Sequence, residues 1–197
     1  MTDVTSAQRR PWILALFLIV GGALGEWAAF SLTIDKLRLL ADPSAELDCN
    51  FNLLVTCGKN LDSWQGSLFG FPNSLIGLGA FVAPIAVGVA LLAGARFARW
   101  FWIAFNLGLL GALAFVVFLI TTSIYFLGTL CPWCMLVWSV TIPMFLAVTA
   151  RNLAEGVYGG GRGVGRFVLS WIVPITVVLY LVVAVLAQLR LDWLSYL

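Results

Sequence analysis

The chain has 197 residues, of which 62% are hydrophobic and only 10% charged, and its mean hydropathy is +1.03. So few polar side chains cannot cover a water-soluble protein of this length, and the composition therefore predicts an integral membrane protein. The net charge is only +2 and the Lys and Arg residues are scattered, which argues against a nucleic-acid surface or a polybasic lipid-binding patch. The chain contains no histidine, which excludes histidine-dependent catalytic triads and removes the commonest metal ligand.

Five apolar segments are long enough to cross a bilayer, for which a helix needs about 20 residues. The first segment follows Arg9 and Arg10 and resembles a signal peptide, but its apolar run continues past the possible cleavage site at residues 23–25. We therefore expect an uncleaved first helix. The third and fourth segments are separated by little more than residues 128–130, which predicts a tight hairpin. The expected spans are residues 12–33, 73–94, 100–127, 131–150 and 167–188.

The distribution of Lys and Arg predicts the orientation, because cytoplasmic loops carry an excess of these cations. With the N-terminus inside, the cytoplasmic segments hold more of them than the outer segments, so we expect a cytoplasmic N-terminus. All four cysteines then lie on the oxidising face, two in the first outer loop and two at the start of the fourth span. The inner cations are Arg9, Arg10, Arg96, Arg99, Arg151, Arg162 and Arg166, and the outer ones are Lys36, Arg38, Lys59 and Arg190.

The first outer loop, residues 34–72, is longer than a simple connection needs, and such loops are usually functional. Its second half predicts a short interfacial helix at residues 62–71, with Asp62 as the candidate N-cap and an apolar edge that includes Trp64. This helix would cover the outer ends of the spans as a lid. The Gly-rich segment 156–163 predicts a flexible tether for the fifth span.

The fourth span opens with Cys131-Pro132-Trp133-Cys134. Cysteines three residues apart on a helix share a face, and the unpaired N–H groups and dipole of the first turn stabilise a thiolate. Pro132 suits this turn because its missing N–H costs nothing there. In a chain without histidine, the helix terminus is the main means of keeping either thiol reactive, and Lys59 can assist Cys57 in a similar way.

The two cysteine pairs have alternative interpretations. A zinc site is disfavoured, because structural zinc usually lies in aqueous loops whereas Cys131 and Cys134 open an apolar helix, so we expect no metal. A structural disulfide between Cys49 and Cys57 is the common fate of such cysteines and would leave a non-enzymatic membrane scaffold. Two pairs on one face favour electron transfer by thiolate attack on a disulfide, which needs neither metal nor histidine.

Electrons that reach a cysteine pair in the membrane need a lipid-soluble acceptor, and a quinone is the obvious one. Asn73, at the outer start of the second span, is the strongly hydrogen-bonding neutral side chain at that depth. It is our candidate for holding a quinone carbonyl, although a helix-end cap or interface residue is the simpler interpretation of a lone asparagine.

The order of these features is similar to that of the vitamin K epoxide reductase family in its bacterial five-helix form, over roughly residues 10–150. The disulfide-bond protein B type of quinone reductase performs the same chemistry, but its Cys-x-x-Cys motif precedes the loop pair, so chain order favours the first family. The features are the loop pair Cys49-x7-Cys57, then Ser63, then Phe71-Pro72-Asn73-Ser74, and finally Cys131-Pro132-Trp133-Cys134.

The resemblance implies an all-α integral membrane fold, with a four-helix transmembrane bundle around a quinone and a fifth, peripheral transmembrane helix. It implies a thiol oxidoreductase in which Cys134 reacts with a quinone of the menaquinone, ubiquinone or vitamin K type and Cys131 exchanges with Cys57. Cys49 would receive electrons from a thioredoxin-like or DsbA-like extracytoplasmic protein, in support of disulfide formation in exported proteins.

Two further residues take roles from the resemblance. Asn73 would donate a hydrogen bond to the quinone, and Ser63 would belong to the region that closes over the site. One position departs from the family pattern: Trp138 stands four residues after the second cysteine of the motif, where the vertebrate enzymes have tyrosine. This departure puts vitamin K epoxide in doubt as the substrate and fits a quinone reductase of the bacterial plasma membrane.

Some bacterial relatives fuse a thioredoxin-like domain after the fifth helix, and since this chain ends at Leu197 we expect its partner to be a separate protein. The expected organisation is a cytoplasmic tail at 1–11, a catalytic bundle at 12–150 that includes the extracytoplasmic loop 34–72, a cytoplasmic Gly-rich linker at 151–166, and the fifth helix with a short extracytoplasmic tail at 167–197.

Overall fold

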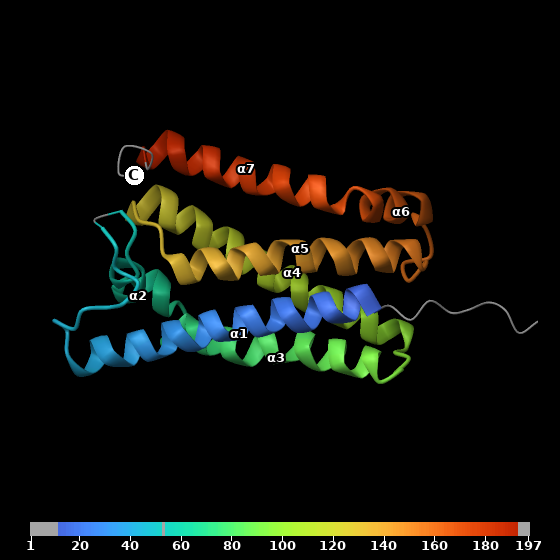
Figure 1. Ribbon diagram of the computed structural model, residues 1–197, viewed down its shortest axis with the longest axis horizontal. Coiled ribbons are helices and arrows are strands. Elements are labelled where there is room, and N and C mark those ends of the chain that lie inside the picture. The colour runs from blue at the N-terminus through green and yellow to red at the C-terminus, as the bar shows by residue number, and fades with distance from the viewer. Residues whose placement is uncertain (1–11, 53, 193–197) are drawn as a thin grey trace, which may run out of the picture.

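The computed structural model describes residues 12–192 except residue 53 (Figure 1). Five of its helical segments are long and apolar enough to cross a membrane, which confirms the five spans and the all-α membrane fold. They are α1 (Trp12–Ala41), α3 (Asn73–Leu92), α4 (Arg99–Thr121) with its π-helical extension η2 (Thr122–Leu127), α5 (Pro132–Ala154) and α7 (Ile172–Leu191). The shorter elements are α2 (Gly58–Asp62), the 3-10 helix η1 (Trp64–Ser67) and α6 (Arg162–Ser170).

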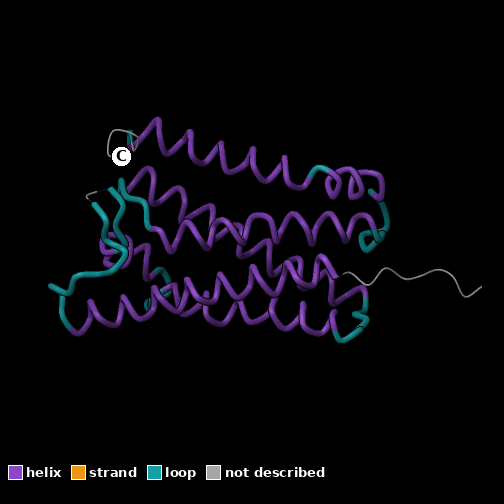
Figure 2. Tube along the Cα trace, in the orientation of Figure 1, coloured by secondary structure: helices purple, strands orange, loops and turns teal. Residues whose placement is uncertain are grey.

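The first four spans form a bundle in which α1 packs against α3 and α5, and α4 packs against α5. The loop that contains α2 and the hairpin between α4 and α5 meet at the same end of this bundle, which we call the loop end (Figure 2). The fifth span, α7, lies alongside α5, where the Tyr180 hydroxyl donates a hydrogen bond to the carbonyl of Ser139. Its helix buries only Thr176 and Ala187 among the described residues, so the fifth helix is peripheral as predicted.

Small residues bring α1 and α3 together. A Cβ atom on Gly25 would lie 2.3 Å from the ring of Phe81, and one on Gly88 would lie 2.7 Å from the backbone oxygen of Ala15. Within a membrane, where burial against lipid gives no hydrophobic driving force, such close contact supplies the dispersion attraction that holds helices together.

The first helix continues eight residues beyond the predicted end of its span and reaches Ala41. Hydropathy detects only the apolar part of a helix, and the charged side chains after Thr33 ended the predicted span. The helix persists because Leu32, Asp35 and Leu39 are buried at three- and four-residue spacing, which keeps one face on the rest of the protein. This extension raises Asp35 to the level of the loop.

The helix boundaries predicted for the lid at residues 62–71 are wrong. Asp62 ends α2 instead of capping a new helix, and its carboxylate lies 3.2 Å from the ammonium of Lys36. The cap of η1 is Ser63, which is extended and whose hydroxyl accepts a hydrogen bond from the backbone N–H of Gly66 at 3.1 Å. Because the extended backbone of Ser63 separates the two elements, the segment forms two short helices rather than one.

The end of α5 and the start of the fifth span also differ from expectation. The helix α5 continues to Ala154, and α6 occupies Arg162–Ser170, so that α7 begins only at Ile172. A Cβ atom on Gly165 would lie 2.3 Å from the backbone nitrogen of Ala154, which means that α6 rests directly on α5. Gly165, which lies just beyond the predicted tether, therefore serves to pack α6 against α5.

The contact between α1 and α3 generates a stability prediction. Replacing Gly88→Val should lower the free energy of unfolding by about 1–3 kcal/mol, because the new side chain would overlap the backbone of α1, which cannot move aside. The matched control is Gly79→Val on the same helix, where no atom of the described residues lies within 4 Å of an added Cβ. Thermal unfolding in detergent measures both variants, and equal midpoints for the two would contradict the prediction.

Candidate functional site

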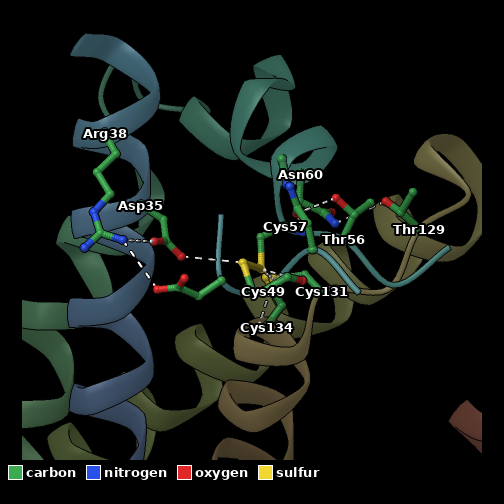
Figure 3. The surroundings of a disulfide bond; sticks show 12 residues. Asp35, Arg38, Cys49, Thr56, Cys57, Asn60, Thr129, Cys131 and Cys134 are labelled. Atoms are coloured by element: carbon green, nitrogen blue, oxygen red, sulfur yellow. Dashed lines mark hydrogen bonds and ion pairs between the residues drawn. A yellow bond between two sulfur atoms is a disulfide. The ribbon is translucent and has the colours of Figure 1, made fainter. Parts of the chain in front are cut away.

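The four predicted cysteines gather at the loop end of the bundle (Figure 3). Cys49 and Cys57 form a disulfide, whereas Cys131 and Cys134 are free thiols. The sulfur of Cys131 lies 3.2 Å from the sulfur of Cys57. A thiol in contact with one sulfur of a disulfide is the arrangement from which thiol–disulfide exchange begins.

Backbone pairing holds the loop disulfide against the start of α5. Val55 and Leu130 form an isolated parallel bridge, in which the N–H of Thr56 donates to the carbonyl of Leu130 at 3.0 Å. The N–H of Leu130 in turn donates to the carbonyl of Leu54 at 2.8 Å. Since Leu130 immediately precedes Cys131, this bridge brings the loop cysteine and the helix cysteine together.

Two asparagines reinforce the same junction. The side-chain oxygen of Asn50 accepts hydrogen bonds from the Thr56 hydroxyl at 2.6 Å and from the N–H of Cys57 at 3.0 Å, which closes the loop around the disulfide. The amide of Asn60 donates to Thr129 at 3.2 Å and accepts from the Ser123 hydroxyl at 3.0 Å. These bonds link α2 to η2 and to the hairpin that leads into α5 (Figure 3).

Cys131 is the N-cap of α5, and its sulfur accepts a hydrogen bond from the N–H of Cys134 at 3.4 Å. The pKa of the Cys131 thiol is lowered, chiefly by a side-chain hydrogen bond from Cys134, although burial opposes the shift. The N–H groups of Cys134 and Trp133 add to the effect. The helix terminus thus contributes as expected from the sequence, but the neighbouring thiol contributes more.

Below the sulfurs lies a cavity of about 700 Å³, enclosed mainly by α3, α4 and α5 and covered by α2 and η1. Cys134 lines this cavity, as do Asn73 and Ser63, so the structure brings three of the predicted site residues to one space. Its walls are mostly apolar, and its polar residues gather near the loop end. Those near the loop end are Asn60, Ser63, Gln65, Asn73, Ser74, Thr122 and Ser123, and Thr141 lines the cavity further along α5.

Asn73 and Ser63 shape the cover of this cavity. The Asn73 amide donates to the carbonyl of Gln65 at 2.6 Å, and its oxygen accepts from the N–H of Leu68 at 3.1 Å. An asparagine amide carries two N–H donors, and the carbonyl of Gln65 accepts from one of them. The Ser63 hydroxyl donates to the carbonyl of Asn60 at 2.8 Å. Both side chains thus have structural partners in the loop in addition to their place in the cavity wall.

Two cavity residues were not assigned a role from the sequence. The indole nitrogen of Trp138 and the hydroxyl of Ser74 are buried without a hydrogen-bond partner among the described residues, and both residues line the cavity. A buried donor without a partner costs about 1–3 kcal/mol, which a bound acceptor would recover. The sequence signal for Trp138 was its position one helical turn after Cys134, which puts both on one face.

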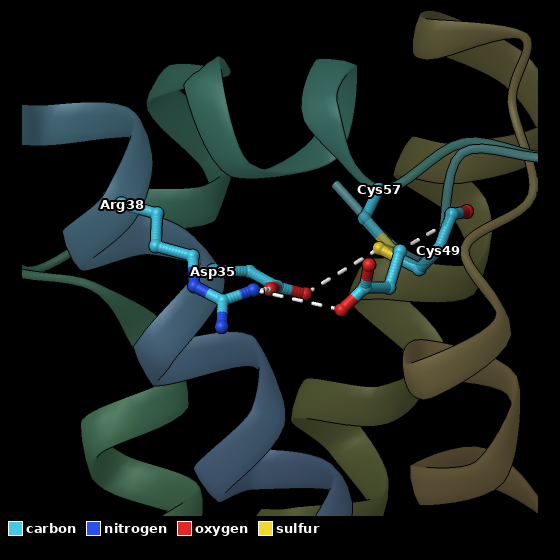
Figure 4. A network of polar contacts seen from close by, with 5 residues as sticks. Asp35, Arg38, Cys49 and Cys57 are labelled. Atoms are coloured by element: carbon cyan, nitrogen blue, oxygen red, sulfur yellow. Dashed lines mark hydrogen bonds and ion pairs between the residues drawn. A yellow bond between two sulfur atoms is a disulfide. The ribbon is translucent and has the colours of Figure 1, made fainter. Parts of the chain in front are cut away.

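An acidic group beside the disulfide was also missed. The side chain of Asp35 is only 7% exposed, and one of its oxygens lies 3.5 Å from the sulfur of Cys49 (Figure 4). Its other oxygen lies 3.8 Å from the guanidinium of Arg38, which also lies 3.5 Å from the carboxylate of Asp48. The position of Asp35 beyond the predicted span concealed it, although its spacing from Leu32 places it on the buried face.

Comparison with known proteins agrees with this geometry. Residues 16–149 match the model of the vitamin K epoxide reductase family, a stretch that contains all four cysteines and ends within α5. No curated protein matches the chain. The matched stretch covers more than half of the sequence and includes the four-helix bundle. The chain therefore belongs to the vitamin K epoxide reductase family and is a multi-pass membrane protein of the disulfide oxidoreductase class.

Proposed function

We propose that the protein oxidises a thioredoxin-like or DsbA-like extracytoplasmic protein and passes the electrons to a membrane quinone. The observation that carries this proposal is the contact of 3.2 Å between the sulfurs of Cys131 and Cys57, combined with the position of Cys134 in the cavity wall. Cys49 and Cys57 lie in the loop, and Cys134 of the second pair lines a cavity within the membrane-spanning bundle. In this proposal the four sulfurs connect a protein substrate in water to a quinone in the membrane.

The first half of the cycle oxidises the partner protein. A thiolate of the partner attacks Cys49, a mixed disulfide forms, and Cys57 leaves as a thiolate. The second thiol of the partner then attacks the mixed disulfide and releases Cys49, so that the partner departs with a disulfide. Cys49 and Cys57 now hold its two electrons.

The second half moves these electrons along the sulfurs. Cys57 attacks Cys131 of a Cys131–Cys134 disulfide and releases Cys134, after which Cys49 attacks Cys57 and releases Cys131. The product has a closed loop disulfide and two free thiols on α5, which is the state of the described structure. The lowered pKa of Cys131 makes it a good leaving group in the last of these steps.

The cavity fits a quinone in size and in chemistry. Its volume of about 700 Å³ lies within the range of about 300–1,000 Å³ that is usual for small-molecule sites. Asn73 and Trp138 supply N–H donors for carbonyl oxygens, and Ser63 shapes the cover. A quinone held there would supply the oxidant, accepting two electrons and two protons, and Cys134 and Cys131 would then hold the closed disulfide.

The orientation completes the proposal. With the N-terminus in the cytoplasm, as the distribution of Lys and Arg predicts, the loop end faces the extracytoplasmic side, where exported proteins acquire disulfides. The protein then supports disulfide formation in exported proteins. The scaffold alternative assigns the loop disulfide a purely structural role, but it gives no reason for a free thiol in contact with that disulfide.

Turnover tests the proposed path. In lipid nanodiscs, the protein should form quinol from quinone when it is supplied with a reduced DsbA-like protein, and Cys49→Ala or Cys131→Ala should abolish this activity. A partner that lacks its second cysteine should remain attached to Cys49 as a mixed disulfide, visible by non-reducing electrophoresis. The Cys49→Ala protein is the control for this capture. Absence of quinol with every quinone class, with all four cysteines intact, would favour the scaffold.

The cavity itself can be tested by filling it. Gly111 lies in the cavity wall on α4, and an added Cβ there meets no atom within 4 Å in the part of the chain that the structure describes. Gly111→Leu should therefore project into the space without disturbing the helices. We expect the KM for quinone to rise at least about tenfold, a loss of about 1.4 kcal/mol. The loop disulfide should still form. Gly79→Leu, outside the cavity wall, is the matched control, and an equal KM in both variants would contradict the quinone site.

The unpartnered indole gives a finer test. Trp138→Phe keeps the aromatic ring and removes the N–H donor, so it should weaken quinone binding by about 1–2 kcal/mol, which is a factor of about 5–30 in KM. The rate at saturating quinone should change little, because the sulfurs remain in place. Trp100→Phe, an exposed tryptophan near the other end of the bundle, is the control. An unchanged KM in Trp138→Phe would remove the indole from the site.

A further inference from the structure

A buried carboxyl group touches the disulfide at the sulfur where the partner enters. Asp35 lies on the extension of α1 beyond its apolar part, and its side chain is 7% exposed. One carboxyl oxygen lies 3.5 Å from the sulfur of Cys49. Because a sulfur in a disulfide carries no hydrogen, this contact becomes a hydrogen bond between the two groups only when Asp35 is protonated or Cys49 is reduced. Figure 4 shows the carboxyl group pointing at the disulfide.

The chemistry at Cys49 requires a group that exchanges protons. In every cycle Cys49 leaves the partner as a thiolate and later attacks Cys57, so its sulfur gains and loses one proton. The α5 N-terminus serves Cys131, but Cys49 lies in a turn of the loop and has no such helix terminus. The chain contains no histidine, the residue that most often performs this task.

We propose that Asp35 is the proton donor and acceptor for the Cys49 thiol, an assignment that rests on the function proposed above. When Cys49 attacks Cys57 of the Cys57–Cys131 mixed disulfide, the bond between Cys49 and Cys57 forms. The bond between Cys57 and Cys131 breaks, and its electron pair leaves on Cys131. The proton of Cys49 passes to the Asp35 carboxylate. When the partner later releases Cys49, Asp35 returns this proton to the departing thiolate, so the carboxyl group is regenerated in each cycle.

The groups around Asp35 suit this exchange. Arg38 on the same helix lies 3.8 Å from one carboxyl oxygen and orients it, and the same guanidinium is shared with Asp48 of the loop. On α5, the thiol that feels the charge of Asp35 is Cys131, whose pKa the carboxylate raises. Once Asp35 has taken the Cys49 proton, its charge no longer opposes the Cys131 thiolate. Acceptance of the proton therefore favours the departure of Cys131.

The carboxylate of Asp48 provides the matched comparison. It pairs with the same guanidinium as Asp35 but is 92% exposed, and the sulfur contact belongs to Asp35. A role limited to the charge balance of Arg38 predicts similar effects for Asp35→Asn and Asp48→Asn. A role in proton transfer predicts an effect for Asp35→Asn alone.

The test uses the full-length protein in nanodiscs and needs no quinone. Dithiothreitol opens the Cys49–Cys57 disulfide, and thiol-specific mass tags follow the reaction; whichever sulfur is attacked first, Cys49 must leave once as a thiolate. We expect Asp35→Asn to slow opening by about 10²-fold, whereas Asp48→Asn stays within threefold of wild type and Asp35→Glu recovers part of the rate. Wild-type rates for Asp35→Asn would overturn the proposal.

The pH dependence supplies a second measurement that does not depend on how well the variant folds. After correction for the ionisation of dithiothreitol, the wild-type rate should fall as the pH rises and Asp35 loses its proton. The Asp48→Asn protein should keep this fall. A flat wild-type profile overturns the assignment. If Asp35 governs disulfide opening but no quinone is reduced, the proposed function fails and the proton-transfer role stands; if quinone is reduced but Asp35→Asn opens normally, only the role fails.

Discussion

The bridge between Val55 and Leu130 is the interaction on which the arrangement of the sulfurs depends. It joins a loop that follows α1 to the residue that precedes Cys131, and it thereby sets Cys57 against Cys131. Each of its two backbone hydrogen bonds contributes only about 1 kcal/mol. The bridge therefore positions the loop but is weak enough to open. Cys49, which lies in the same loop, is only 3% exposed in this arrangement.

The first turn of α5 separates the contact with the loop disulfide from the contact with the cavity. Cys131 caps the helix and faces the loop disulfide, while Cys134, one turn later, lines the cavity among the spans. The separation of three residues keeps both sulfurs on one helix face and within reach of each other. A single helical turn therefore connects the loop disulfide to the cavity among the spans. The small residues of α4, among them Gly108 and Gly111, leave the space on the other side of that turn.

The groups that contact the two cysteine pairs differ in the same way. The Cys131 thiol obtains its lowered pKa from Cys134 and from the N–H groups of the helix start. Asp35, raised to the level of the loop by the extension of α1, contacts the other end of the sulfur chain at Cys49. A chain without histidine thus presents a helix terminus at one cysteine pair and a carboxyl group at the other. Arg38 offsets only part of the burial of this carboxyl group, and it also binds the loop through Asp48.

The sequence by itself determined the five spans and the spacing of the four cysteines along the chain, because hydropathy and residue spacing are local properties that survive without a fold. The predicted boundaries were wrong where a helix continues past its apolar part, as α1 does beyond Thr33. They were also wrong in the loop, where the cap of η1 is Ser63 instead of Asp62. The family resemblance implied that Cys131 exchanges with Cys57, and the structure places their sulfurs 3.2 Å apart. Only the tertiary structure decided that the Trp138 indole has no hydrogen-bond partner among the described residues beside a cavity, and that Asp35 touches Cys49. These are contacts between distant segments, which depend on how helices pack and where a loop returns.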